Sequence, residues 1–461
     1  MFFNPLCVIL SLTGCYLLFK LKFFFVLHPF RTCKKCILAF KSVSVFKSLM
    51  LALAGTLGVG NIFGVCLGLI LGGEGSVFWL FISVIFSSAL KYSEVVISYD
   101  NLSHSGDGAS GSMFYSLRSA FRTYGRSLAF VYALFCLLLS FSMGGGLQSG
   151  TAYETLSGLF NTPPLVFCLF FVPIIAFSIF KGVRLIEKIT LYVIPFATIV
   201  YIFITIAIII LNLSNLPDVI YRIMSDAFSF DSAGGGILGF LLSSKIREGF
   251  SRGILSNEAG CGTSSMAHSR SGILNPASAG LMGILEVFFD TAVLCMLTAL
   301  SVLSAIPDVS VYKEGMSLIL DAVENTLGSG FEFAILVCVL IFAYSTVVCW
   351  YYYGSECFSF LVGRARKSLY FPLFILAVIL GVVIDNILLV ALTDCFILVL
   401  SVLTVSLLIK KSDRIKLLSE KGGVIPKRTV RIKIRGNVSS TSLKRQASKS
   451  SFRPRTRSSE K

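Results

Sequence analysis

Residues 54–64 read Ala54-Gly55-Thr56-Leu57-Gly58-Val59-Gly60-Asn61-Ile62-Phe63-Gly64 and lie inside a long apolar stretch. Its four glycines each cost a helix about 1 kcal/mol relative to alanine. Backbone that opens within a membrane is tolerated only where it is buried in protein or lines a cavity. The stretch therefore predicts a membrane helix that is interrupted beside a cavity, and the polar residues Thr56 and Asn61 favour this interpretation. Close helix packing through Gly60 and Gly64, as in a GxxxG motif, is the alternative.

The composition is that of a membrane protein. Mean hydropathy is +0.84, 55% of the residues are apolar and only 14% are charged, too few for the surface of a soluble chain. Apolar runs of about 20 residues recur, each long enough to cross a hydrocarbon core of roughly 30 Å. We expect eleven spans: an extra N-terminal one at Pro5–Leu27 and ten more at 46–70, 76–98, 128–158, 164–181, 189–212, 234–268, 277–306, 330–362, 369–387 and 388–410.

The charges of the loops predict the orientation of the chain. Basic residues are concentrated in every second loop, as the positive-inside rule requires. This places the N-terminus outside the cell membrane and the C-terminus in the cytoplasm. The basic loops contain Arg31, Lys34, Lys35, Lys41, Lys47, Arg118, Arg122, Arg126, Lys181, Arg184, Lys188, Arg270, Arg364, Arg366 and Lys367.

The C-terminal tail carries most of the net charge of +16. From Lys411 onward it has 16 basic residues against three acidic ones. Such a tail cannot bury a core, so it is expected to be disordered and to attract anionic lipid headgroups. Phe452 is its only aromatic residue, which argues against nucleic-acid binding. The 13 cysteines are scattered, and the pair Cys33 and Cys36 lacks a second pair for a metal site.

A second interrupted span is expected near the middle of the chain. Residues 245–262 combine several glycines with charged residues that must face protein or water, because each costs roughly 2.5–3.5 kcal/mol at a bilayer centre. Salt bridges between helix ends are the alternative role for some of them. Interrupted segments at corresponding places in two halves are typical of a transporter's binding site. The charged residues are Lys245, Arg247, Glu248, Arg252 and Glu258.

Two further elements carry polar groups into apolar spans. Thr346, Trp350 and Tyr353 fall on one helical face and are suited to line a small pocket, although Tyr351–Tyr353 could also form an interfacial aromatic belt. Gln148 follows three glycines within the third core span, where an interhelical hydrogen bond is the alternative to a binding role.

Several ordered motifs resemble those of the alanine or glycine:cation symporter family, also called sodium:alanine symporters. The resemblance covers about residues 10–410. Its motifs are Ala52–Ile62, Leu71–Gly73, Lys91–Glu94, Arg252–Gly260 with Ala267 and His268, Asp290–Thr291 with Cys295 and Leu297–Leu300, and Phe342–Gly354.

The family resemblance implies an all-α polytopic membrane fold with about 11 transmembrane helices. It would be a leucine-transporter-type inverted repeat of five plus five helices with one extra N-terminal helix. Residues 1–45 would hold the extra helix and a basic cytoplasmic loop. The two five-helix repeats would span 46–212 and 232–410, and 411–461 would be the basic tail.

The resemblance also implies the site. The substrate-binding residues would be Gly58, Val59, Gly60, Asn61, Gln148, Leu255, Ser256, Thr346 and Trp350. Backbone N–H groups at Gly58, Val59 and Gly60 would hold a carboxylate at a half-helix end, and Trp350 would limit the size of the substrate side chain. The ligands of a coupled Na⁺ would be the carbonyls of Ala54 and Leu57 and the hydroxyls of Ser345 and Thr346.

The implied function is secondary active uptake of alanine or glycine, in the L or D form, by symport with Na⁺ or H⁺ through alternating access. No other cofactor, no enzyme activity and no nucleic-acid partner is expected, and the protein is expected to be a monomer. An amino-acid exchanger or exporter of the same fold is the alternative. A membrane-embedded enzyme that uses Glu258 and His268 is a further one, although no paired acid–base or metal-ligand cluster is visible.

Overall fold

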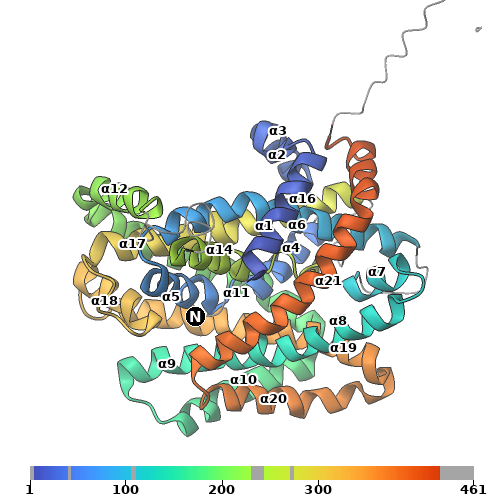
Figure 1. The fold of residues 1–461 in the computed structure, drawn as a ribbon. Coiled ribbons are helices and arrows are strands. Elements are labelled where there is room, and N and C mark those ends of the chain that lie inside the picture. Colours follow the sequence, from blue (N-terminus) through green and yellow to red (C-terminus); the bar gives the residue numbers. More distant parts are fainter. Residues whose placement is uncertain (1–4, 40–42, 105–110, 230–242, 270–274, 426–461) are drawn as a thin grey trace, which may run out of the picture. The chain divides into compact units, whose positions relative to one another are not determined.

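The computed structural model describes residues 5–39, 43–104, 111–229, 243–269 and 275–425, and every regular element in these ranges is a helix (Figure 1). The first half contains α1 (Pro5–Lys20), α2 (Phe24–Leu27), α3 (Pro29–Ala39), α4 (Val43–Thr56), η1 (Val59–Asn61), α5 (Phe63–Gly72), α6 (Ser76–His104), α7 (Met113–Ala120), α8 (Gly125–Leu139), η2 (Ser140–Leu147), α9 (Gln148–Phe160), α10 (Pro164–Lys181) and α11 (Val183–Leu211). The second half contains η3 (Leu213–Asn215), α12 (Leu216–Ala227), α14 (Ser244–Asn257), α15 (Ser265–His268), α16 (Pro276–Val287), η5 (Phe288–Cys295), α17 (Met296–Ala305), α18 (Gly315–Leu327), α19 (Glu332–Val362), η6 (Arg364–Leu369), α20 (Tyr370–Gly381) and α21 (Asn386–Lys421).

Seven of the eleven predicted spans correspond to helices that are long and apolar enough to cross a membrane. A bent pair at Pro29–Leu38 and Val43–Thr56 would make eight among the described residues. The chain is thus confirmed as a polytopic helical membrane protein. The seven helices are Ser76–Leu102, Gly125–Phe160, Pro164–Lys181, Lys188–Leu211, Pro276–Ala305, Glu332–Val362 and Asn386–Lys421.

The other predicted spans are shorter or interrupted. The N-terminal helix α1 ends at Lys20, and Lys22 and Phe23 adopt positive φ angles before α2 begins. Helix α20 has 12 residues and is therefore only about 18 Å long. The spans at 46–70 and 234–268 are both broken, and residues 234–242 of the latter lie outside the described residues.

Three segments that the sequence predicts as loops or tail are helical. Residues 216–227 and 315–327 form α12 and α18. Helix α21 continues through the start of the predicted tail to Lys421, and two hydrogen bonds of 2.8 and 2.7 Å join Arg414 in this part to Asp100 on α6. Residues 426–461 of the predicted tail lie outside the described residues.

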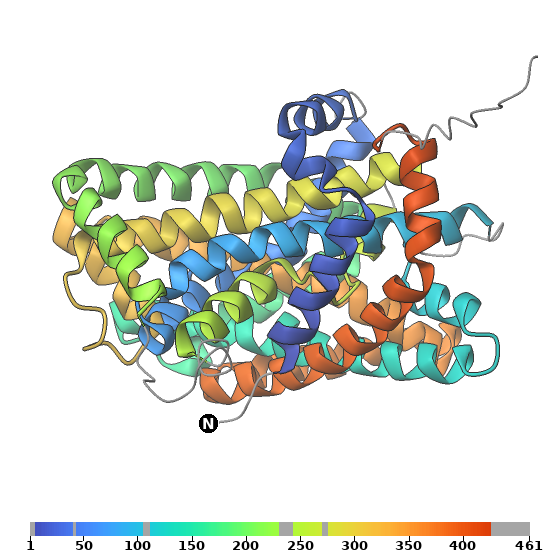
Figure 2. The same ribbon diagram turned by 45° about the horizontal axis from the view of Figure 1, so that its top comes forward.

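Helix α6 packs along α14, which belongs to the second interrupted span, and along α16 (Figure 2). A Cβ atom at Gly253 of α14 would overlap the Ser83 hydroxyl oxygen of α6, and one at Gly249 would overlap the Ser76 carbonyl oxygen. The backbone of α14 therefore lies directly against α6. On the other side, α4 packs against α11 and α19, and α5 packs against α14 and α18.

Candidate functional site

The first interrupted span opens where the sequence predicts it. Helix α4 ends at Thr56, the short helix η1 covers Val59–Asn61, and α5 begins at Phe63. Side chains satisfy the backbone groups that the break releases, as burial in a membrane requires. The N–H of Val59 donates to Gln148 Oε1 over 3.0 Å, and the indole N–H of Trp350 donates to the carbonyl of Gly55 over 3.2 Å.

Helix α19 presents the predicted polar face to this break. The Thr346 hydroxyl, the Trp350 indole and the Tyr353 ring all contact residues 54–58 of the first interrupted span. Tyr352 and Tyr353 are buried, and Tyr351 packs against the rings of Tyr370 and Phe374. The burial of Tyr352 and Tyr353 favours a packing role for these two rings, and the interfacial belt at Tyr351–Tyr353 stays an alternative.

Gly58 lies at the closest approach between the break and its neighbours. A Cβ atom at this position would lie 2.7 Å from Gln148 Oε1 and 3.0 Å from Thr346 Oγ1. Only glycine leaves room for these polar atoms in this arrangement. Gln148 Nε2 donates to the carbonyl of Met143 over 3.2 Å, so both ends of the amide are bound and one of them makes the expected interhelical contact.

Three of the four predicted Na⁺ ligands lie together. Thr346 Oγ1 is 3.0 Å from the carbonyl oxygen of Ala54 and 3.4 Å from that of Leu57, and it donates to both. The Ser345 hydroxyl instead donates to carbonyls of its own helix, at Ile341 and Phe342. These are hard oxygen donors of the kind that Na⁺ takes, but Na⁺ binding here stays a prediction.

A cavity adjoins the break in the first span. Four of the predicted substrate residues line it: Gly58, Gly60, Gln148 and Ser256. Its wall also includes Gly55, Thr56, Phe63, Gly64, Met143, Leu147, Arg252, Val390, Thr393 and Asp394.

The other predicted substrate residues do not form the wall of this cavity. Thr346 and Trp350 contact the lining residues Gly58 and Gly55 from behind, and the Val59 N–H is bound to Gln148. Asn61 points to η5, where Nδ2 donates to the Asp290 carboxylate over 2.8 Å. Leu255 belongs to α14, but its side chain lies outside the described part of the structure. Substrate binding by all these residues remains a prediction.

Sequence reasoning missed the contribution of α21 to the cavity. Asp394 lines it together with Thr393, and its Oδ1 atom is buried without a hydrogen-bond partner among the described residues. Arg252 lines the same cavity and makes a 3.1 Å ion pair with Glu248. A single acidic residue within the apolar run 388–410 is a signal that could have identified Asp394.

The second interrupted span also breaks as predicted. Helix α14 ends at Asn257, and helix resumes only at Ser265. Between them Glu258 has a φ of 53° and Gly260 a φ of 92°. A non-glycine residue in this left-handed region is uncommon, and a cost of order 1–3 kcal/mol must be met by the surroundings.

Four of the five charged residues predicted in this span are in ion pairs, and the pair of Lys245 with Asp226 joins two helices, as the alternative interpretation of this span holds. Glu248 pairs with Arg247 and Arg252 over 3.1 Å each, and Lys245 Nζ lies 2.8 Å from Asp226 Oδ1. The Asp226 carboxylate also accepts from the N–H of Gly75 over 2.7 Å. These contacts tie α12 to the start of α14 and to the loop that precedes α6.

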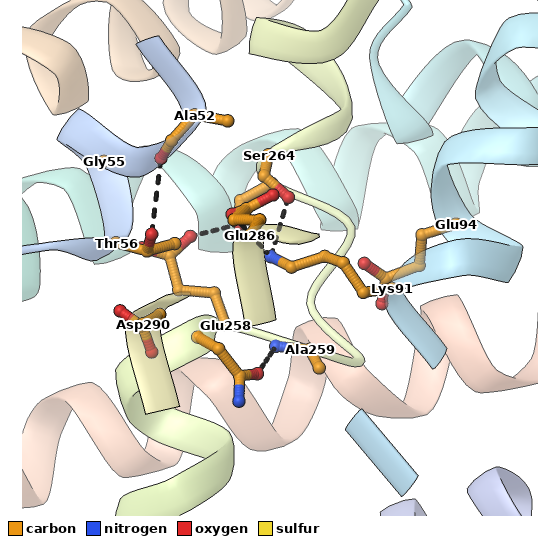
Figure 3. Close-up of polar contacts among 12 residues, drawn as sticks. Ala52, Gly55, Thr56, Lys91, Glu94, Glu258, Ala259, Ser264, Glu286 and Asp290 are labelled. Atoms are coloured by element: carbon orange, nitrogen blue, oxygen red, sulfur yellow. Dashed lines mark hydrogen bonds and ion pairs between the residues drawn. The ribbon is translucent and has the colours of Figure 1, made fainter. Parts of the chain in front are cut away.

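Glu258 belongs to a buried polar cluster beside the second break (Figure 3). Lys91 reaches from α6 to Ser264 Oγ at 2.7 Å and to Glu286 at 3.2 Å. His268 Nε2 lies 2.7 Å from the other oxygen of Glu286, whereas Glu258 accepts from the Thr263 hydroxyl. Glu258 and His268 are therefore bonded to different partners.

Comparison with known proteins identifies the family. A sequence model of the sodium:alanine symporter family matches residues 1–417. The chain belongs to the sodium:alanine symporter family. It is 31% identical over 347 residues to the sodium/alanine symporter of Methanococcus maripaludis, which covers 74% of this chain and 75% of the relative.

Other relatives carry different names. The sodium/proton-dependent alanine carrier of Bacillus sp. (strain PS3) is 31% identical over 340 residues, or 71% of this chain and 75% of the relative. The probable sodium/glutamine symporter of Bacillus subtilis is 29% identical over 377 residues, which cover 79% of this chain and 76% of the relative. Membership in this family confirms that the chain is a multi-pass membrane transporter that moves an amino acid together with a cation. It is consistent with the expectation that the chain is not an enzyme.

Proposed function

We propose that this sodium:alanine symporter family member takes up a small neutral amino acid, alanine or glycine in either chiral form, together with Na⁺ by alternating access. H⁺ is the alternative coupling ion. The observation that carries the proposal is the break at Leu57–Gly58, whose released backbone groups border a cavity and are held by α19 and Gln148. Relatives named for alanine support alanine as the first substrate to test.

The substrate carboxylate would bind the backbone N–H groups at Gly58, Val59 and Gly60. These groups precede α5, where the helix dipole favours an anion. The Val59 N–H is already bound by an oxygen of Gln148. Gln148 Oε1 therefore stands where a carboxylate oxygen would, and we propose that the substrate displaces it while Gln148 Nε2 turns to the bound carboxylate.

The indole of Trp350 would limit the length of the substrate side chain. It is fully buried, it is fixed by its bond to Gly55, and its Cβ atom packs against Gly144. A ring held on two sides cannot move aside for a larger substrate. This supports alanine or glycine over glutamine for the present chain.

The cation would bind the carbonyls of Ala54 and Leu57 and the hydroxyls of Thr346 and Ser345, after rotation of the Ser345 hydroxyl away from its own helix. A tenfold Na⁺ gradient supplies about 1.4 kcal/mol, and a membrane potential of about 100 mV adds about 2.3 kcal/mol. Together they sustain very roughly a 500-fold gradient of a zwitterion, so one ion per cycle is enough.

We further propose the leucine-transporter-type inverted repeat for residues 46–212 and 232–410, with an extra N-terminal helix in 1–45. The two breaks fall in the first and sixth core spans, and each of these spans opens a five-span half, which supports the repeat. The N-terminus would lie outside and the C-terminus in the cytoplasm. The basic tail would contact anionic lipid headgroups, and the transporter would act as a monomer in the cell membrane.

The test is uptake of radiolabelled alanine by proteoliposomes that contain the full-length protein. An inward Na⁺ gradient should drive accumulation, and unlabelled glycine or D-alanine should compete better than glutamine. Uptake that ignores both Na⁺ and pH gradients would refute symport. Counterflow without any gradient dependence would identify an exchanger instead.

A further inference from the structure

The polar cluster beside the second break has more acidic than basic groups. Glu94, Glu258 and Glu286 are all fully buried, and the buried base beside them is Lys91. His268 adds at most one further positive charge, through its contact with Glu286. Three carboxylates therefore face one or two cations in an environment that excludes water. An unneutralised buried carboxylate is so costly that such a group takes up a proton instead.

The hydrogen bonds indicate which carboxylate holds this proton. Glu286 is bound by Lys91 and His268. Glu94 Oε1 accepts from the backbone N–H of Gly260 over 2.5 Å, and Lys91 lies one helical turn away on the same helix. Glu258 accepts the hydroxyl of Thr263, and both Glu258 Oε1 and Glu94 Oε2 are buried without a hydrogen-bond partner among the described residues. The hydrogen bonds therefore leave Glu94 and Glu258 as the carboxylates for this proton, and Glu258 is the one that belongs to the break itself.

The place of Glu258 in the chain connects its charge to the second break. It is the first residue after α14, it has a left-handed backbone, and the Gly260 N–H two residues later binds Glu94. A movement of the segment 258–264 would change the distance from the Glu258 carboxylate to Lys91. The affinity of Glu258 for a proton would change with it, because the attraction between unit charges depends on their separation.

A proton fits Glu258 better than a metal ion. Among the residues that the structure describes, no group of three or more His, Cys, Asp and Glu side chains could hold a metal. A proton needs one carboxylate oxygen, and Glu258 Oε1 is available.

Further titratable groups face Glu258 from the surrounding helices. They are Lys91 on α6, Glu286 on α16, Asp290 on η5, Cys136 on α8, Cys349 and Tyr353 on α19, and Cys261 in the break itself, while Glu94 on α6 and His268 on α15 belong to the same cluster through Lys91 and Glu286.

We propose that Glu258 is a proton-binding site whose proton is taken up and released as the segment 258–264 rearranges during amino-acid transport. This inference rests on the proposed uptake function. The Glu258 carboxylate takes up H⁺ on one side of the membrane to become a neutral carboxylic acid, and this acid releases the same H⁺ on the other side and becomes a carboxylate again. A proton would then be transported together with the amino acid, in addition to the Na⁺ that we propose at the first break.

The experiment uses proteoliposomes with a pH-sensitive dye inside and no Na⁺ gradient. In the wild type, external alanine should acidify the lumen, and an inward pH gradient should raise alanine accumulation. Glu258→Gln mimics the protonated acid, so this variant should keep alanine counterflow but lose gradient-driven accumulation at least tenfold. Glu356→Gln, which removes a carboxylate paired with Lys367 outside the cluster, is the matched control and should behave as the wild type.

Some outcomes overturn the proton site and leave symport intact. One is Na⁺-driven alanine uptake by the wild type without proton entry or a response to the pH gradient. Another is proton-coupled uptake that persists in Glu258→Gln. If no gradient drives uptake in the wild type, the proposed function fails as well.

A second measurement covers the case in which Glu258→Gln does not fold. Calorimetry of alanine binding to the purified wild type, in two buffers of different ionisation enthalpy, gives the number of protons exchanged per alanine. A nonzero number supports the site, and zero overturns it.

Discussion

The Thr346→Val substitution tests the cation site at the first break most directly. Valine keeps the size of threonine but removes the hydroxyl that donates to Ala54 and Leu57 over 3.0 and 3.4 Å. Two buried carbonyls then lose their side-chain donor, which costs about 1–3 kcal/mol of folding stability in total. The proposed Na⁺ site would lose one of its oxygen ligands, and we expect the half-saturating Na⁺ concentration to rise at least tenfold, equivalent to about 1.4 kcal/mol.

Two assays separate these effects. Alanine uptake is measured against Na⁺ concentration, and thermal unfolding is measured with and without Na⁺. A ligand at about 100 times its Kd stabilises the wild type by about 2.7 kcal/mol, and a tenfold weaker site reduces this to about 1.4 kcal/mol. The general stability cost appears without Na⁺, whereas the loss of the site appears only as a smaller response to Na⁺.

Two control variants complete this experiment. Thr346→Ser keeps the hydroxyl and should retain most of the Na⁺ response. Thr155→Val removes a buried hydroxyl that bonds only to its own helix, at Thr151, and should leave the Na⁺ response unchanged. The reasoning is refuted if Thr346→Val has the Na⁺ response of the wild type, or if Thr346→Ser loses as much of it as Thr346→Val.

Three further predictions concern other contacts. Gly58→Ala places a Cβ atom 2.7 Å from Gln148 Oε1, so uptake should fall at least tenfold, whereas Gly158→Ala, where a Cβ meets open space, should be neutral in the same assay. Trp350→Phe and Trp79→Phe each remove a 3.2 Å indole hydrogen bond and should each cost about 0.5–1.5 kcal/mol in thermal unfolding. Competition assays should find that only Trp350→Phe admits larger amino acids, and equal selectivity in the two variants would contradict a size limit at Trp350. Burial raises the pKa of Glu74 even though Arg222 opposes this shift, so the folded state holds the Glu74 proton more firmly than the unfolded state. This contribution to stability is present below a pH of about 4 and is lost as the pH rises through the raised pKa of Glu74. Glu74→Gln should therefore flatten the pH dependence of unfolding above about pH 4, and an unchanged slope would count against the assignment.

The sequence predicted the parts of the fold that depend on local chemistry. Glycines and a polar pair in residues 54–64 located the first break, and charged residues among glycines located the second. Helical spacing identified the face of α19 that meets α4. These features are encoded within one segment, so no knowledge of the neighbouring segments is needed.

Contacts between segments that are distant in the chain could not be predicted from the sequence. The choice of Glu286 as the partner of His268, and of Thr263 as the partner of Glu258, depends on how α15 and α16 pack. Asp394 reaches the cavity only because α21 passes it. Helices α12 and α18 lie in segments that are too polar to be predicted as membrane spans. The 12-residue length of α20 depends on where its helical hydrogen bonds stop, which the sequence does not show.

The glycine contact between α14 and α6 has a mechanical consequence for the proposed transport cycle. At Gly249 the backbone of α14 lies directly against the Ser76 carbonyl of α6, so no side chain at this contact can rotate to absorb a sliding movement. Helices α14 and α6 are therefore expected to move as one rigid body. The opposite contact, between α4 and α19, includes the Thr346 hydroxyl, which can exchange its partners by rotation. The hinge is expected there, on the side where the cation would bind.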